Sequence, residues 1–304
     1  MMARTEVKIG NDTRGEDALM NAVTLRPLAM GEILDHAFGL FRQLFVPLVV
    51  VQVITSSLPL LLNLYSAATG STSTLGSLAT YLVAFVLGSL ASAATAYIIS
   101  ENYLGRPLAA GEALRRAVPR MGDVMLLSLG VGFVVVIAAL PALLVIGAGS
   151  AFAVLGGASG GGASTGGGAL LVLVGLALLA IPFAVFSGLS IATPALVLES
   201  IRAGRAMSRS WQLTKGFRLR IVGLLFVVMV IVLLPMFALG IIGGMFGSAE
   251  SRTSTVIFTA IIGVVSLIVT PLLYCVLTLL YYDLRVRKEG YDLEVLASEL
   301  PAPS

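Results

Sequence analysis

Cationic side chains are the chemically active groups that this sequence repeats at regular spacing. The densest group lies in residues 199–220, which hold six of the 19 Lys and Arg residues of the chain. On a helix, the small and apolar residues of this stretch share one face and the basic residues share the other. Such a helix typically lies in a membrane interface, where each cation gains about 1 kcal/mol from anionic lipid. This stretch and the basic stretch at 106–120 together supply eight candidate contacts for lipid head groups or a partner. They are Arg115, Arg116, Arg120, Arg202, Arg205, Arg209, Lys215 and Arg218.

These cations have a second explanation that the sequence leaves open. Lys and Arg also gather beside membrane spans because they set the orientation of the chain, and residues with that role need bind nothing. The aromatic residues Trp211, Tyr281 and Tyr282 fall where spans are expected to begin or end. Aromatic belts are typical of those levels, so we interpret all three as interfacial anchors.

Catalytic and metal-binding groups do not converge in this sequence. There is one histidine, His36, and one cysteine, Cys275, so a multi-histidine metal site and an intramolecular disulfide are both excluded. Residues 157–161 fit the G-x-S-x-G pattern of hydrolases, but they lie in a glycine tract with no strand pattern before it. We expect His36 to be exposed on a polar helix face. We predict no catalytic residue, no metal, no cofactor and no nucleic-acid partner.

The composition predicts a polytopic α-helical membrane protein. The chain of 304 residues is 58% hydrophobic and 12% charged, about half the charge of a soluble domain, with a mean hydropathy of +1.00. Its apolar runs are each long enough to cross a hydrocarbon core, and backbone groups in lipid must pair within a helix. The predicted spans are residues 44–65, 78–100, 124–147, 170–196, 221–246 and 255–282.

We expect one six-helix membrane domain over residues 26–298, between a flexible tail at 1–25 and a short end at 299–304. No cleavable signal peptide is expected before the first span. The Gly/Ser/Ala tract at 149–168 is predicted to be a flexible loop. The glycines between 240 and 247 are interpreted as a close-packing surface, with a dimer contact as the alternative.

A threefold internal repeat organises the chain. The sequence RPLAAGEAL at 106–114 matches RPLAMGEIL at 26–34 in seven of nine positions, and residues 199–220 form a weaker third copy. Each copy is predicted to contain a cytosolic amphipathic interfacial helix, a proline-kinked span, a loop and a returning span with a threonine. The prolines are Pro59, Pro141 and Pro235, and the threonines are Thr95, Thr193 and Thr270.

The distribution of charge predicts the orientation of the chain. Of the 19 Lys and Arg residues, all but Arg252 fall on one side of the predicted spans. By the positive-inside rule this side is cytosolic, which places both termini in the cytosol. No acidic or basic residue lies inside a span, so the usual mark of an ion pathway or proton relay is missing.

Three stretches of the sequence resemble a known family. They are the pattern R-P-L-x-x-G-E-I-L at 26–34, RSWQLTKG at 209–216 and YYDLRVRKEGYDL at 281–293. All three are similar to the membrane domain of glycerophosphoryl diester phosphodiesterases and its stand-alone bacterial relatives of unknown function. The resemblance implies a multi-span module of the bacterial inner membrane. It does not imply the diesterase activity, which in the fused relatives belongs to a separate barrel domain with histidines and metal-binding carboxylates.

Three hypotheses for function remain, in order of preference. The first is a non-enzymatic module that contacts membrane lipids, including anionic head groups, or another membrane protein. The second is a transporter or permease for an apolar or lipid-like substrate, which needs no intramembrane charge; a mid-membrane cavity lined by Thr95, Thr193 and Thr270 would favour it. The third is an intramembrane enzyme, which no constellation of residues supports.

Overall fold

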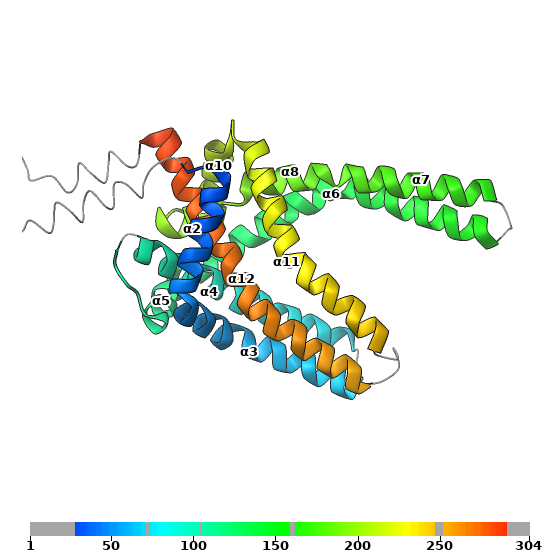
Figure 1. The fold of residues 1–304 in the computed structure, drawn as a ribbon, viewed down its shortest axis with the longest axis horizontal. Helices are drawn as coiled ribbons and strands as arrows, with labels where there is room; N and C mark the ends of the chain where they lie inside the picture. The colour runs from blue at the N-terminus through cyan, green and yellow to red at the C-terminus, as the bar shows by residue number, and fades with distance from the viewer. Residues whose placement is uncertain (1–27, 71–72, 104, 159–161, 247–251, 291–304) are drawn as a thin grey trace, which may run out of the picture.

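Every secondary-structure element in the described part of the chain is a helix. The computed structural model describes residues 28–70, 73–103, 105–158, 162–246 and 252–290 (Figure 1). The short helices at one end of the molecule are α2 (Met30–Gln43), α5 (Ala110–Ala117) with the 3-10 turn η1 (Val118–Arg120), and α10 (Ala203–Thr214). The long apolar helices are α3 (Phe45–Thr69), α4 (Thr74–Tyr103), α6 (Met121–Ala158), α11 (Arg218–Phe246) and α12 (Arg252–Glu289). A broken run comprises α7 (Gly162–Leu178), α8 (Ala180–Leu189) and α9 (Ala192–Leu198).

Six stretches of helix are long and apolar enough to cross a membrane, as the sequence predicts. They are Phe45–Thr69, Thr74–Tyr103, Ala110–Gly156, Gly166–Leu198, Arg218–Ile241 and Arg252–Glu289. The chain is therefore an all-α, multi-pass membrane protein. The limits predicted for the tail at 1–25 and the end at 299–304 fall outside the described residues.

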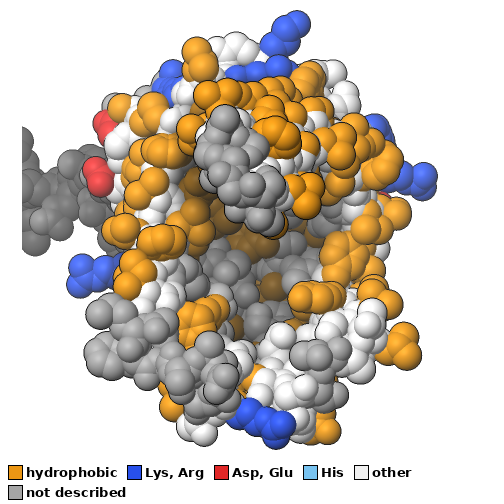
Figure 2. All heavy atoms as spheres, turned by 90° about the vertical axis from the view of Figure 1, so that its right-hand side faces the viewer, with side chains coloured by type: hydrophobic (Ala, Val, Ile, Leu, Met, Phe, Trp, Pro, Cys, Tyr) orange, Lys and Arg blue, Asp and Glu red, His pale blue; other side chains and the backbone are white. Residues whose placement is uncertain are grey.

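The long helices form two groups that separate along the molecule. Helices α3, α4 and α12 pack together, and α6 pairs with α7 and α8 as a second arm, while α11 contacts both α8 and α12 (Figure 1). The groups meet at the end that carries α2, α5 and α10, which we call the basic end. Figure 2 looks from the other end into a hollow between the two groups, with apolar side chains along part of its edge.

The described parts of the glycine-rich tract, residues 149–158 and 162–168, form helix rather than the predicted flexible loop. Helix α6 continues to Ala158 and α7 begins at Gly162. The glycines let the two backbones approach, because a Cβ on Gly149 would lie 2.8 Å from the carbonyl oxygen of Gly168, and a Cβ on Gly168 would lie 2.6 Å from the Cβ of Ala153. Small residues commonly permit such close helix packing in membranes. The G-x-S-x-G string ends at residues 159–161, outside the described residues.

The predicted fourth span is broken twice instead of being one helix. Prolines at 182 and 194 cannot donate a backbone hydrogen bond to the carbonyls four residues earlier, and the chain departs from α-helix at Leu179 and at Ser190–Ile191. The second break is buried in protein and docks on α10. The hydroxyls of Ser210 and Thr214 donate to the carbonyl oxygen of Gly188 at 2.9 and 3.2 Å. Irregular backbone at membrane depth is tolerated where protein groups satisfy it in this way.

The short helices bury equivalent positions of the predicted repeat. Under the sequence alignment of the three copies, the paired inward positions are fully buried: Ile33 and Ala37 in α2, Ala113 and Ala117 in α5, Ala206 and Ser210 in α10. The prolines at 59, 141 and 235 each lie inside the long helix that follows a short one. These agreements support the repeat, which stays a prediction.

Candidate functional site

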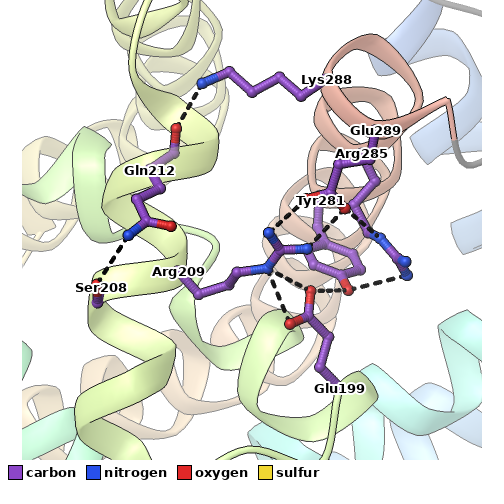
Figure 3. Close-up of polar contacts among 8 residues, drawn as sticks. All are labelled: Glu199, Ser208, Arg209, Gln212, Tyr281, Arg285, Lys288 and Glu289. Carbon is purple, nitrogen blue, oxygen red and sulfur yellow. Dashed lines mark hydrogen bonds and ion pairs between the residues drawn. The ribbon is translucent and has the colours of Figure 1, made fainter.

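The basic end is held together by ion pairs that join α9, α10 and α12 (Figure 3). Arg209 of α10 donates from Nε to both oxygens of Glu199 at 2.9 and 3.0 Å, and from a terminal nitrogen to Glu289 of α12 at 2.7 Å. The hydroxyl of Tyr281 donates to Glu199 at 3.0 Å. The hydrogen bond to Glu289 is the main cause that raises the pKa of Arg209. Lys288 adds a bond to the carbonyl oxygen of Gln212 at 2.6 Å.

A second cluster fixes the backbone of Leu28, just before α2, against α12. The Asp283 side chain is 1% exposed and accepts from the backbone N–H of Leu28 at 2.8 Å and from Arg287 Nε at 2.9 Å. Arg287 also donates to the Leu28 carbonyl at 2.7 Å, and Arg220 of α11 contacts both Asp283 and that carbonyl. The cluster therefore ties three elements to one buried carboxylate.

The arginines around α5 are partly engaged as well. Arg116 donates to Glu112 on its own helix at 3.0 Å and contacts Glu101 of α4 at 3.5 Å. Arg120 donates to the carbonyl oxygen of Ser200 at 3.3 Å, which links η1 to the turn before α10.

The structure divides the eight predicted contact cations into two sets. Four are engaged with protein: Arg116, Arg120 and Arg209 as above, and Arg218, whose guanidinium lies 3.9 Å from the centre of the Trp211 ring. The other four are exposed and form no ion pair with any residue of the described ranges. These open cations are Arg115, Arg202, Arg205 and Lys215.

The three predicted aromatic anchors differ in how far their side chains are exposed. Trp211 is 39% exposed, and its role as an interfacial anchor stays a prediction. Tyr281 and Tyr282 are 0% and 3% exposed, so the prediction that they anchor the chain in lipid is wrong. Their hydroxyls are used inside the protein, because Tyr281 binds Glu199 and Tyr282 shares a hydrogen bond of 2.6 Å with Ser100 of α4.

The described residues line clefts in two places that bear on function. One, of about 400 Å³, separates α3 from α12 and is lined by Ser56, Asn63, Thr259 and Ser266 among others. The other, of about 340 Å³, lies at the basic end and includes His36, which is exposed as predicted. Neither is lined by the repeat threonines Thr95, Thr193 and Thr270. Within the described ranges, no group of three or more His, Cys, Asp or Glu residues is placed to hold a metal ion.

The fold and the basic end together define an integral membrane domain built only of helices in its described parts. The chain matches the family model described as the membrane domain of glycerophosphoryl diester phosphodiesterase over residues 167–297. This match confirms the resemblance and covers the stretches at 209–216 and 281–293, while the stretch at 26–34 lies outside it. No match was found among curated proteins or among solved structures.

The stretch at 281–293, one of the three that carry the resemblance, has a structural explanation in its first nine residues. Residues 281–289 supply Tyr281 and Glu289 to the first cluster and Asp283 and Arg287 to the second. Their spacing follows the turns of α12, so that one helix end holds both clusters. The sequence alone gave no partner for these residues, because Glu199, Arg209 and Arg220 lie far from them along the chain.

Proposed function

We propose that this chain is a non-enzymatic module of the bacterial cytoplasmic membrane whose basic end faces the cytosol and contacts anionic lipid head groups. The observation that carries the proposal is the set of open cations. Arg202, Arg205 and Lys215 lie around α10, and Arg115 lies on α5, all exposed and without a protein anion in the described ranges. Had the cations served only to set topology, nothing would require this exposed subset to surround amphipathic helices.

The position of Trp211 supports contact between α10 and the membrane. Its ring is partly exposed beside Arg218, which places an amphipathic ring and a cation on the same patch. Such pairs suit the boundary between head groups and acyl chains, where an aromatic ring meets apolar and polar surroundings at once. The cytosolic orientation rests on the positive-inside rule, since the basic end carries the cations of α5 and α10.

A second candidate is transport of an apolar or lipid-like substrate. The observation that favours it is the hollow between the two helix groups, together with the broken fourth span (Figure 2). Discontinuous helices are typical of substrate sites in transporters. Reconstitution with a fluorescent lipid and measurement of its transfer between leaflets would test this candidate directly.

The proposed lipid contact is tested by native mass spectrometry of protein released from nanodiscs that contain phosphatidylcholine and phosphatidylserine. We expect the double variant Arg202→Gln/Arg205→Gln to lose most of the retained phosphatidylserine. The double variant Arg116→Gln/Arg120→Gln removes the same charge from the same end, but from residues that already bind protein, and should retain it. Equal loss from both variants, or no loss from either, would refute the specific contact. A co-purifying protein released by the first variant alone would identify the open cations as a partner surface instead.

The orientation is tested with cysteines introduced at Lys215 and at Ser73, at opposite ends of the bundle. The native Cys275 is buried and should give little background. In intact cells, a membrane-impermeant maleimide should label the cysteine at 73 and spare the one at 215. The reverse pattern would place the basic end outside.

A further inference from the structure

The cleft of about 340 Å³ at the basic end has the lining of a ligand site. His36, Gly39 and Gln43 of α2 form one wall, one helical turn apart. Asn102 and Tyr103, at the end of α4, form the other, and Leu40 of α2, which is only partly buried, adds an apolar surface. We call this space the polar cleft. Its volume is at the lower end of the range typical of small-molecule sites.

The lining groups share one chemical property. The imidazole of His36, the carboxamides of Gln43 and Asn102 and the phenol of Tyr103 offer both donors and acceptors, and none of the described residues that line the cleft is Lys, Arg, Asp or Glu. The side chains of His36, Gln43 and Asn102 make no hydrogen bond to any residue in the described ranges. Carboxamides present a donor and an acceptor side by side, which matches neighbouring hydroxyl groups. The set suits an uncharged, hydrogen-bonding ligand better than an anion or a cation.

The level of the polar cleft points to the source of such a ligand. The apolar helix α3 begins at Phe45, two residues after Gln43, and α4 ends at Tyr103. Phe45 and Val46 are 40% and 69% exposed, so lipid chains can lie against the start of α3 beside the cleft. The cleft therefore lies where apolar spans give way to polar residues, the level at which lipid head groups are found.

We propose that the polar cleft binds an uncharged polyhydroxyl group, such as the inositol or sugar head group of a membrane lipid. The two carboxamides and the imidazole bind hydroxyl groups, and Leu40 contacts the carbon skeleton of the ring. A soluble polyol offers the same chemistry without the acyl chains. This site is separate from the open cations and does not rest on them.

The test compares two glycines of the same helix. A Cβ on Gly39 or on Gly31 meets no atom within 4 Å, so a leucine fits at either position without a clash with the rest of the protein. Gly39 lines the polar cleft and Gly31 does not. Gly39→Leu fills the cleft, whereas Gly31→Leu is a control with the same gain in apolar area and helix propensity. Gln43→Met is a second variant that keeps the side-chain shape and removes the amide.

The measurement is retention of lipid from phosphatidylcholine nanodiscs that contain either phosphatidylinositol or phosphatidylserine. Both guest lipids are anionic, and the first carries a polyhydroxyl ring. Wild type and Gly31→Leu should retain phosphatidylinositol at least tenfold more strongly than Gly39→Leu does. Retention of phosphatidylinositol by Gln43→Met should lie between that of wild type and that of Gly39→Leu. Retention of phosphatidylserine should be unchanged by all three substitutions.

Two results would overturn the proposal. One is retention of phosphatidylinositol by Gly39→Leu at the wild-type level; the other is equal sensitivity of phosphatidylserine, which would make charge rather than hydroxyl groups the determinant. Titration with free inositol separates the two sources. Binding of free inositol that Gly39→Leu abolishes identifies a soluble polyol site, and binding of the lipid alone identifies a lipid site. The open-cation variant Arg202→Gln/Arg205→Gln should leave inositol binding intact. The experiments therefore distinguish failure of the open-cation proposal from failure of the polar-cleft proposal.

Discussion

The buried carboxylate of Asp283 is the most informative single position for the stability of the basic end. Substitution Asp283→Asn keeps the size of the side chain and removes its charge. The carboxylate now accepts from Leu28 N–H and from Arg287, and an amide places an N–H₂ group against one of these donors. Removing one partner of a fully buried pair costs about 3–5 kcal/mol. Because Arg287 and Arg220 are 22% and 21% exposed, water recovers part of that energy. We expect a loss of roughly 2–3 kcal/mol.

The assay is reversible unfolding in mixed micelles, followed by the fluorescence of the single tryptophan, Trp211. A loss of this size increases the unfolding constant by about 30- to 150-fold. The matched control is Glu112→Gln, which removes a carboxylate from an exposed pair on α5, with side chains 46% and 47% exposed. Its expected cost is below about 1 kcal/mol.

The reasoning fails if Asp283→Asn costs no more than Glu112→Gln. A double-mutant cycle with Arg287→Met then decides whether the pair is coupled at all. Coupling near zero would mean that the ion pair between Asp283 and Arg287 contributes nothing to the stability of the folded state. A coupling of about 1 kcal/mol or more would show that this ion pair stabilises the folded state.

Two further predictions concern the packing of the spans and use the same unfolding assay. Gly168→Leu should destabilise the protein by roughly 1–3 kcal/mol, because the new side chain meets Ala153 at once, whereas Gly166→Leu, with no atom within 4 Å of its Cβ, should be nearly neutral; equal effects would contradict the close packing of α6 and α7. The hydroxyls of Thr95 and Thr278 are buried and have no hydrogen-bond partner among the residues that the structure describes. Thr95→Val and Thr278→Val should therefore leave stability unchanged or raise it by up to about 1 kcal/mol, and a clear loss would show that bound water or another polar group satisfies them.

The sequence predicts the membrane class of this fold well, because apolar runs of span length have few alternatives in lipid. The inward faces of α2, α5 and α10 also follow from helical spacing alone. The glycine tract shows where such reasoning stops. Glycine favours a flexible loop in water but close helix packing in a membrane, and composition does not distinguish the two. Gly240, predicted to pack closely, has no atom within 4 Å of a Cβ position.

The candidate site could be predicted only in part. Residue types identified the cations, but they did not show that Arg205 is open whereas Arg209 is paired. That difference arises because only the Arg209 side chain meets Glu199 and Glu289. Tyr281 was misplaced for the same reason, since a tyrosine at the end of a span looks like an anchor until its hydroxyl is seen to bind Glu199. The polar cleft had no sequence signal, because α2 and α4 come together only in the folded chain.

The break in the fourth span imposes an order on how the protein is made. The carbonyl oxygen of Gly188 accepts from the hydroxyls of Ser210 and Thr214, residues 22 and 26 positions further along the chain. A ribosome synthesises Gly188 first, so the nascent span enters the membrane with an unpaired carbonyl at its break. That backbone must stay near water or translocon protein until α10 has emerged and folded back onto it. Insertion of this span is thus tied to the synthesis of the segment that follows it, and a chain interrupted before α10 would leave the carbonyl at the break without its two hydroxyl donors.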